Sequence, residues 1–126
     1  MSTEYLHARQ LVYKGKRIIA VDFSNLTSEQ FVEALNHNTQ VIVNRGERNL
    51  LMLLNATGLL PTPEAYGACK ASAKNMGSYA TKVAVFGIQS IFLPFFNYLT
   101  SVFKMDVRLF KDEMSAKEWL AQDKDG

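Results

Sequence analysis

The sequence predicts an α/β fold in a single domain, residues 1–126, with a mostly parallel five-stranded sheet and one antiparallel strand at its N-terminal end. Short apolar runs rich in β-branched residues alternate with segments of helical spacing, in the order ββαβαβαβα. Strands separated by a helix are parallel neighbours joined by right-handed crossovers. The first two runs are joined by a turn too short for a crossover, so the first strand is the antiparallel one.

The N-terminal third contains a hairpin and the first helix. Residues 10–23 read as two strands joined by a tight turn at Lys14 and Gly15. The run RIIAVDF is nearly continuous in apolar residues, which is typical of a strand covered on both faces. Thr27 is a candidate N-cap, and Gln30 three residues later completes a capping box. The segment TQVIVNR suits a short strand as well, but we favour helix up to Arg45, with Gly46 beyond it.

The remaining elements follow the same alternation. The run NLLMLLN is a buried strand, and the next helix has Thr62 as its cap, Pro63 at its first position and Gly77 as its stop. KVAVFGI is the third buried strand, followed by a helix that begins near Ser90 or Leu93. DVRLFK alternates, which indicates an edge strand, and SAKEWL is a short terminal helix.

Composition and charge exclude several classes of protein. The chain has 14 basic and 12 acidic side chains and a net charge of +2, so no concentrated basic face for nucleic acid is expected. The single cysteine, Cys69, cannot form an intrachain disulfide, which favours a reducing, cytoplasmic location. Polar residues interrupt the apolar stretch 83–103, so we predict no transmembrane segment.

No reaction is indicated by the chemically active residues. The two histidines, His7 and His37, have no local partner that suggests a nucleophile and its base. No spacing of His, Cys or carboxylates resembles a metal site, and the glycines are too isolated for a phosphate loop. We therefore expect no enzyme activity, no metal and no cofactor.

Residues 91–103 read as an amphipathic helix that covers the sheet. Its polar stripe consists of Asn97, Thr100, Ser101 and Lys104. The apolar arc is wide, because four phenylalanines on one helix exceed what one face of a small sheet needs. We expect Phe92, Leu99 and Phe103 to belong to the core.

The edges of that arc are the first candidate binding region. Leu93 and Phe96 on one side and Tyr98 on the other lie far enough round the helix to reach solvent, an apolar cavity or a second copy. With Phe95, they form a surface for one of three partners: a second copy in a homodimer, an apolar or lipid-like small molecule in a pocket beneath the helix, or a regulatory protein.

Polar residues at the ends of the strands are the second candidate region. Ligands of open α/β sheets gather at the carboxyl ends of the strands. Asn25, Asn55, Gln89 and Ser90 follow strands in this sequence. They form either a polar rim around a ligand or partner site, or ordinary turns and helix caps.

The C-terminal stretch from Lys82 to Gln122 resembles the SpoIIAA-like branch of the STAS domains. It shows a strand, a glycine, an apolar helix, a short strand and an ending A-x-x-W-L formed by Ala116, Trp119 and Leu120. The early stretch IIAVDFSNLTSEQF also fits. The resemblance implies a bacterial cytoplasmic domain with a non-enzymatic role, and an architecture shared with the CRAL-TRIO lipid-transfer domains.

The same resemblance implies an alternative function as a phosphorylation switch. In the anti-sigma-antagonist STAS proteins, a strand is followed by Asp-Ser-Ser-Gly, and a partner kinase phosphorylates the second serine. The matching residues here run from Asn55 to Gly58, with Thr57 as the candidate phosphoacceptor. Asn55 replaces the aspartate and Ala56 replaces the first serine.

Overall fold

The computed structural model describes residues 4–103 and 105–122, and it confirms the predicted fold. Five strands form one sheet in the order β1-β2-β3-β4-β5, with β1 antiparallel to β2 and the other neighbours parallel. The strands are β1 (Ala8–Tyr13), β2 (Lys16–Asp22), β3 (Leu50–Asn55), β4 (Ala80–Phe86) and β5 (Asp106–Phe110).

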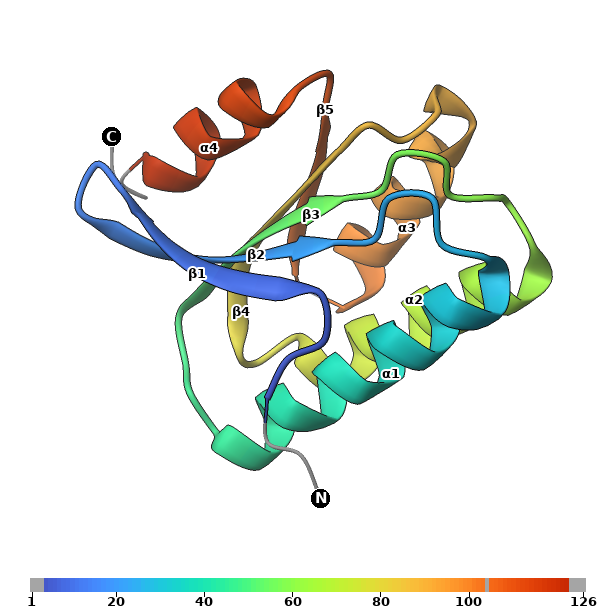
Figure 1. Cartoon of the computed structure of the whole chain (residues 1–126), viewed down its shortest axis with the longest axis horizontal. Helices are drawn as coiled ribbons and strands as arrows, with labels where there is room; N and C mark the ends of the chain where they lie inside the picture. The colour runs from blue at the N-terminus through green and yellow to red at the C-terminus, as the bar shows by residue number, and fades with distance from the viewer. Residues whose placement is uncertain (1–3, 104, 123–126) are drawn as a thin grey trace.

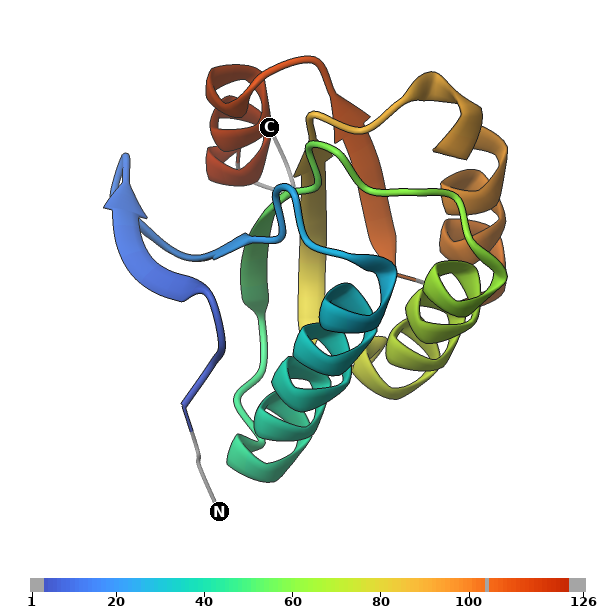
Figure 2. The ribbon, with the colours of Figure 1, turned by 45° about the vertical axis from the view of Figure 1, so that its right-hand side comes forward.

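Three helices cover one face of the sheet and a fourth covers the other (Figures 1 and 2). The three are α1 (Ser28–Arg45), α2 (Pro63–Met76) and α3 (Leu93–Phe103), and a 3-10 turn, η1 (Ser90–Phe92), leads into α3. Figure 2 shows them side by side in chain order. Right-handed crossovers between neighbouring parallel strands place successive helices on the same side, which explains this arrangement. Helix α4 (Glu113–Ala121) follows the last strand and packs on the opposite face.

Local sequence signals set the helix ends. Thr27 accepts from the Gln30 N–H while the Gln30 side chain accepts from the Thr27 N–H, which is the predicted capping box. Helix α1 continues to Arg45, and Gly46 ends it in the left-handed conformation with φ 67°. The alternative strand over residues 39–45 does not form, because Val41 and Ile42 are buried on the inner side of the helix.

The turns and edges of the sheet also agree with the sequence. Lys14 and Gly15 both have positive φ, 50° and 79°, as a two-residue hairpin turn with right-handed strand twist requires. The alternating strand β5 lies at an edge of the sheet, with Val107 buried and Arg108 exposed. A buried amide fastens the segment before β1: Asn38 of α1 accepts from the Leu6 N–H and donates to the Leu6 carbonyl.

Candidate functional site

Helix α3 has an inner face that packs into the main core. Phe92 of η1 and Phe96 and Leu99 of α3 are buried there. Phe92 and Leu99 are therefore core residues, as predicted. Phe103 is half-buried and packs against the edge of this core rather than inside it. The reason is position: it is the last residue of α3, where its backbone passes over Gly77 at the end of α2. Lys104, predicted in the polar stripe, lies outside the described residues.

The flank of η1 and α3 toward α2 carries an apolar stripe that is largely exposed. We call it the outer stripe; it consists of Ile91, Phe95, Tyr98 and Val102, spaced by four, three and four residues. That spacing aligns side chains along one side of a helix. Ile91, Tyr98 and Val102 are 63%, 42% and 49% exposed, and Phe95 is half-buried. The sequence from Gly87 to Phe103 contains no charged residue. The outer stripe is thus an uncharged apolar surface more than two turns long.

Aromatic contacts with α2 hold the outer stripe in place. The Tyr66 and Phe95 rings meet edge to face with centroids 4.6 Å apart, and Phe95 stacks with Tyr98 at 6.4 Å. The Lys70 ammonium of α2 lies 5.9 Å from the centre of the Tyr98 ring, within cation–π range. The middle of the stripe, Phe95 and Tyr98, is therefore held against α2.

Leu93 lies on the other flank of α3, away from the outer stripe. It is 45% exposed and lines a shallow groove between α3 and β5, with Phe96, Asn97 and Thr100. Thr100 joins the two elements, because its hydroxyl lies 3.2 Å from both the carbonyl and the N–H of Val107. Of the four predicted residues on this helix, Leu93 and Tyr98 are thus exposed on opposite flanks, Phe95 is half-buried and Phe96 is interior.

An apolar cavity lies beneath the helices. It measures about 70 Å³ and is bounded by the sheet, α1, α2 and α3, with Phe96, Leu99 and Cys69 in its wall. Two buried hydroxyls also line it, Thr39 and Ser72, and they are hydrogen-bonded to each other at 2.6 Å. An engineered apolar cavity of about 150 Å³ accepts benzene, so the present cavity has room for a few heavy atoms and is far too small for a lipid chain.

Cys69, which lines this cavity, is chemically unreactive. Burial raises the pKa of the Cys69 thiol to about 12, because an apolar environment disfavours the thiolate. The thiol is therefore protonated at neutral pH. It behaves as a small apolar side chain of α2 rather than as a nucleophile.

Three strand-end loops meet at the carboxyl edge of the sheet. The Asn25 N–H donates to the Thr57 carbonyl at 2.8 Å. The Asn55 side-chain oxygen accepts from the Thr57 N–H at 3.1 Å and from the Thr57 hydroxyl at 2.7 Å. On the far side of Thr57, a Cβ added to Gly87 would overlap with the Thr57 Oγ1. Asn25, Asn55 and Thr57 therefore form one cluster.

The other predicted strand-end residues lie at the start of η1. Gln89 and Ser90 are exposed. Gln89 precedes η1 without a side-chain cap, and Ser90 is the first residue of that turn. Thr57 is exposed at the end of β3, as the resemblance implies. Its role as a phosphoacceptor stays a prediction.

Sequence reasoning did not single out Ile91 and Val102, which the structure exposes. Their 4-3-4 spacing with Phe95 and Tyr98 shows that the four residues share a side, but not that this side is exposed. Sequence reasoning also missed Lys70, because contacts between two helices are not visible in a single sequence. Within residues 4–103 and 105–122, no three His, Cys, Asp or Glu side chains gather as a metal site would require. Over the same residues, no helix is long and apolar enough to cross a membrane.

Among solved structures, the chain is similar to an uncharacterized protein of the DUF3478 family from Shewanella loihica PV-4, whose crystal structure has a SpoIIAA-like fold. The TM-score is 0.66 at 16% sequence identity, and the alignment covers 96% of this chain and 99% of that one. Neither a family model nor a curated protein matches the sequence. The likeness shows that this chain has a SpoIIAA-like fold, which confirms the resemblance at the level of the fold.

Proposed function

We propose that this chain is a non-enzymatic docking domain that binds an apolar surface of another molecule through the outer stripe of α3. One observation supports this above all: three of the four stripe residues are substantially exposed on a helix that carries no charge. A single exposed apolar side chain is ordinary. A continuous row over consecutive turns is uncommon on a monomer and typically marks an interaction site.

The core does not account for the stripe. The inner face of α3 already fills the space above β4 and β5 with Phe92, Phe96 and Leu99. Polar residues at positions 91 and 102 would satisfy the same packing, since both side chains are largely exposed. The size of the cavity beneath the helices also favours the outer surface as the binding region, because about 70 Å³ cannot enclose a ligand of lipid size.

A binding role also suits the state of the nucleophilic side chains. The Cys69 thiol is held protonated by burial, and the Thr57 hydroxyl donates to Asn55, an amide oxygen that is a poor base. Neither group is paired with a side chain that would activate it. We therefore propose that the chain recognises a partner and does not catalyse a reaction.

The test compares two double variants of matched exposure. Ile91→Ser with Val102→Ser removes the ends of the outer stripe. Val12→Ser with Met114→Ser alters residues that are 72% and 57% exposed on β1 and α4, elsewhere on the surface. Binding is measured by flotation with phosphatidylcholine vesicles and self-association by sedimentation velocity.

We expect the stripe variant to weaken the association that the wild type shows by about a hundredfold, since two aliphatic side chains lose their burial at about 1.5 kcal/mol or more each. The control pair should leave it unchanged, and both variants should keep wild-type stability. Equal losses in both variants, or a wild type that neither self-associates nor binds vesicles, would contradict the proposal.

A further inference from the structure

We infer that the surface bound by the outer stripe is an anionic lipid bilayer, on which the domain lies with α3 in the plane of the interface. This inference rests on the proposed docking function and names its partner. It is carried by the distribution of charge around the stripe.

Two lysines of α2 flank the stripe. Lys70 contacts Tyr98, as described above, and Lys74 follows one turn later on the same side of α2. The two helices run side by side in the same direction, because Tyr66 meets Phe95 early in α2 and Gly77 meets the Phe103 backbone at its end. Lys74 therefore comes level with the last turn of α3. Both lysines are exposed, so their ammonium groups are available to phosphate groups beside the apolar row.

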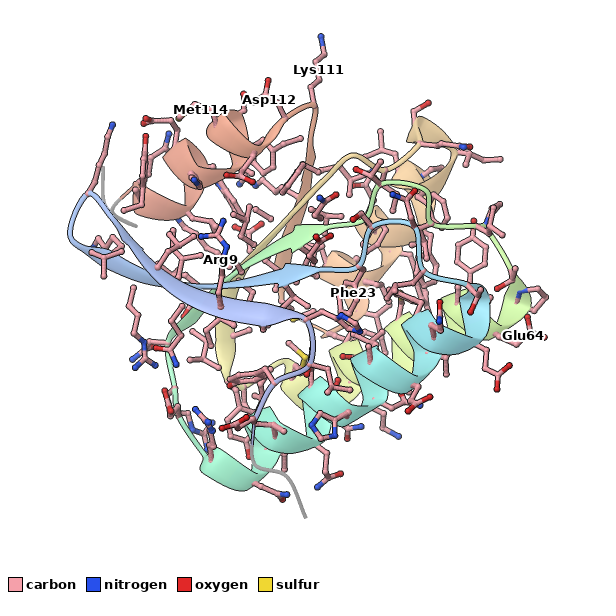
Figure 3. The ribbon with its side chains drawn as sticks, in the orientation of Figure 1. Arg9, Phe23, Glu64, Lys111, Asp112 and Met114 are labelled. Carbon is pink, nitrogen blue, oxygen red and sulfur yellow. The ribbon has the colours of Figure 1, made fainter. Side chains whose placement is uncertain are left out.

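Acidic side chains lie on the opposite side of the same helical layer. Glu29 and Glu33 of α1 share a shallow groove with Glu64 at the start of α2. Figure 3 shows Glu64 beside the start of α1. The helical layer thus has apolar and basic side chains along α3 and the neighbouring part of α2, and acidic side chains along α1 and at the start of α2. An anionic surface attracts the first and repels the second, which fixes the orientation of docking.

The side chains of the stripe suit a lipid interface. Ile91 and Val102 are purely apolar and can enter the acyl boundary, while Tyr98 combines an apolar ring with a polar hydroxyl, as aromatic residues at membrane interfaces do. The helix has 11 residues, which is too short to span a bilayer of about 30 Å but long enough to lie on its surface.

A second copy of the chain fits the charge pattern less well. Pairing two outer stripes about a twofold axis brings Lys70 and Lys74 of both copies to one interface. The segment from Gly87 to Phe103 provides no carboxylate to neutralise them. Like charges brought together in this way disfavour association, whereas an anionic bilayer supplies the missing negative charge.

The experiment measures flotation of the full chain with two kinds of vesicle: pure phosphatidylcholine, and equal parts phosphatidylcholine and phosphatidylglycerol. The test variant is Lys70→Gln with Lys74→Gln. The matched control, Arg9→Gln with Lys111→Gln, removes the same charge from two exposed residues on β1 and before α4. Figure 3 shows Arg9 on β1 and Lys111 at the end of β5.

We expect the wild type to prefer the anionic vesicles by roughly twentyfold, since each lysine near an anionic surface contributes about fivefold. The lysine variant should lose most of that preference, and added salt should reduce it in the wild type. The control should stay within about twofold of the wild type, because its charges belong to β1 and the end of β5 rather than to the helix beside the stripe, and salt screens charges at a distance.

Three results would overturn the inference. Equal binding to both vesicles through the stripe, or self-association through the stripe without vesicle binding, leaves the docking function standing with a different partner. Equal losses in the lysine variant and the control show a general charge effect and reject the assigned site. If the stripe variant Ile91→Ser with Val102→Ser also behaves as the wild type in every assay, the result contradicts the docking function as well as the bilayer inference.

Discussion

At the scale of single residues, Gly87 and Thr57 are in close contact where two strand-end loops meet. Gly87 has φ 79°, a conformation that side chains other than glycine rarely adopt. The Thr57 hydroxyl also occupies the space that a Cβ at position 87 would need. Gly15 has the same φ of 79° but nothing within 4 Å of an added Cβ. Comparing alanine substitutions of Gly15 and Gly87 therefore distinguishes the cost of backbone strain from the cost of steric overlap.

Gly15→Ala should lower the free energy of unfolding by about 1–2 kcal/mol, through strain alone. Gly87→Ala should cost about 1–3 kcal/mol more, because the new methyl group overlaps with Thr57. In a Thr57→Ala background that extra cost should shrink, as urea denaturation of the four variants would show. Equal costs for the two glycine substitutions would contradict this account of the loop contact.

Thr57 itself tests the alternative switch function. If its phosphorylation controls a partner, Thr57→Glu should abolish an interaction that Thr57→Ala preserves, because a phosphate adds roughly −1.5 to −2 of charge. We expect neither change to alter binding through the outer stripe, and only a small effect on the loop. The check is the vesicle assay on both variants, with mass spectrometry of protein from its native cell. A cognate kinase that modifies Thr57 would reverse this expectation.

At the scale of elements, α3 combines a face required for folding with a face that is not. Phe92→Ala and Leu99→Ala should each lower the free energy of unfolding by about 2–5 kcal/mol, the usual cost of emptying a filled core site. Ile91→Ala and Val102→Ala should stay within about 0.5 kcal/mol of the wild type, as exposed positions do. Phe103 is half-buried, so Phe103→Ala should lower the free energy of unfolding by an intermediate amount. Urea unfolding of the five variants provides the comparison.

If Ile91→Ala or Val102→Ala lowered the free energy of unfolding as much as Leu99→Ala does, the stripe would be packed within the chain. The docking proposal depends on the opposite result, because residues free to bind a partner contribute little to folding.

For the whole molecule, Lys82 links the sheet to α4. It lies on β4 with its side chain buried under α4. Its ammonium donates to the Trp119 carbonyl at 3.0 Å and to the Gln122 carbonyl at 2.8 Å. A cation from the sheet thus satisfies carbonyls at the C-terminus of the helix, where the helix dipole favours positive charge.

Replacing Lys82 by Met keeps an unbranched apolar side chain but removes the donor. We expect a loss of about 1–3 kcal/mol, since the Gln122 and Trp119 carbonyls lose a charged donor and the Trp119 carbonyl keeps only the Gln122 N–H. Trp119 is the only tryptophan, so its emission reports the docking of α4 and should shift to longer wavelength. Lys111→Met, at an exposed position, is the control and should change neither quantity. An unchanged emission in Lys82→Met would show that packing alone positions α4.

The sequence by itself determined the element types and the topology of the sheet. The cap at Thr27 with Gln30 and the cap at Thr62 with Pro63 are signals between residues close in the chain, and the structure forms both. The parallel order of the strands follows from chain connectivity and the handedness of crossovers. Even the ambiguous stretch 39–45 was resolved by its neighbours, because Gly46 marks the end of a helix better than the middle of a hairpin.

Only the tertiary structure decided which apolar residues of α3 are covered. Helical spacing shows which side chains share a side, but not where the neighbouring elements lie. Here the inner face of α3 packs on the sheet, and on the flank toward α2 the Tyr66 ring contacts Phe95, while Ile91 and Val102 stay exposed. Packing between residues far apart in the chain likewise placed Lys70 beside Tyr98 and Thr57 against Gly87. Such contacts depend on how the layers fit together, and no local pattern encodes that fit.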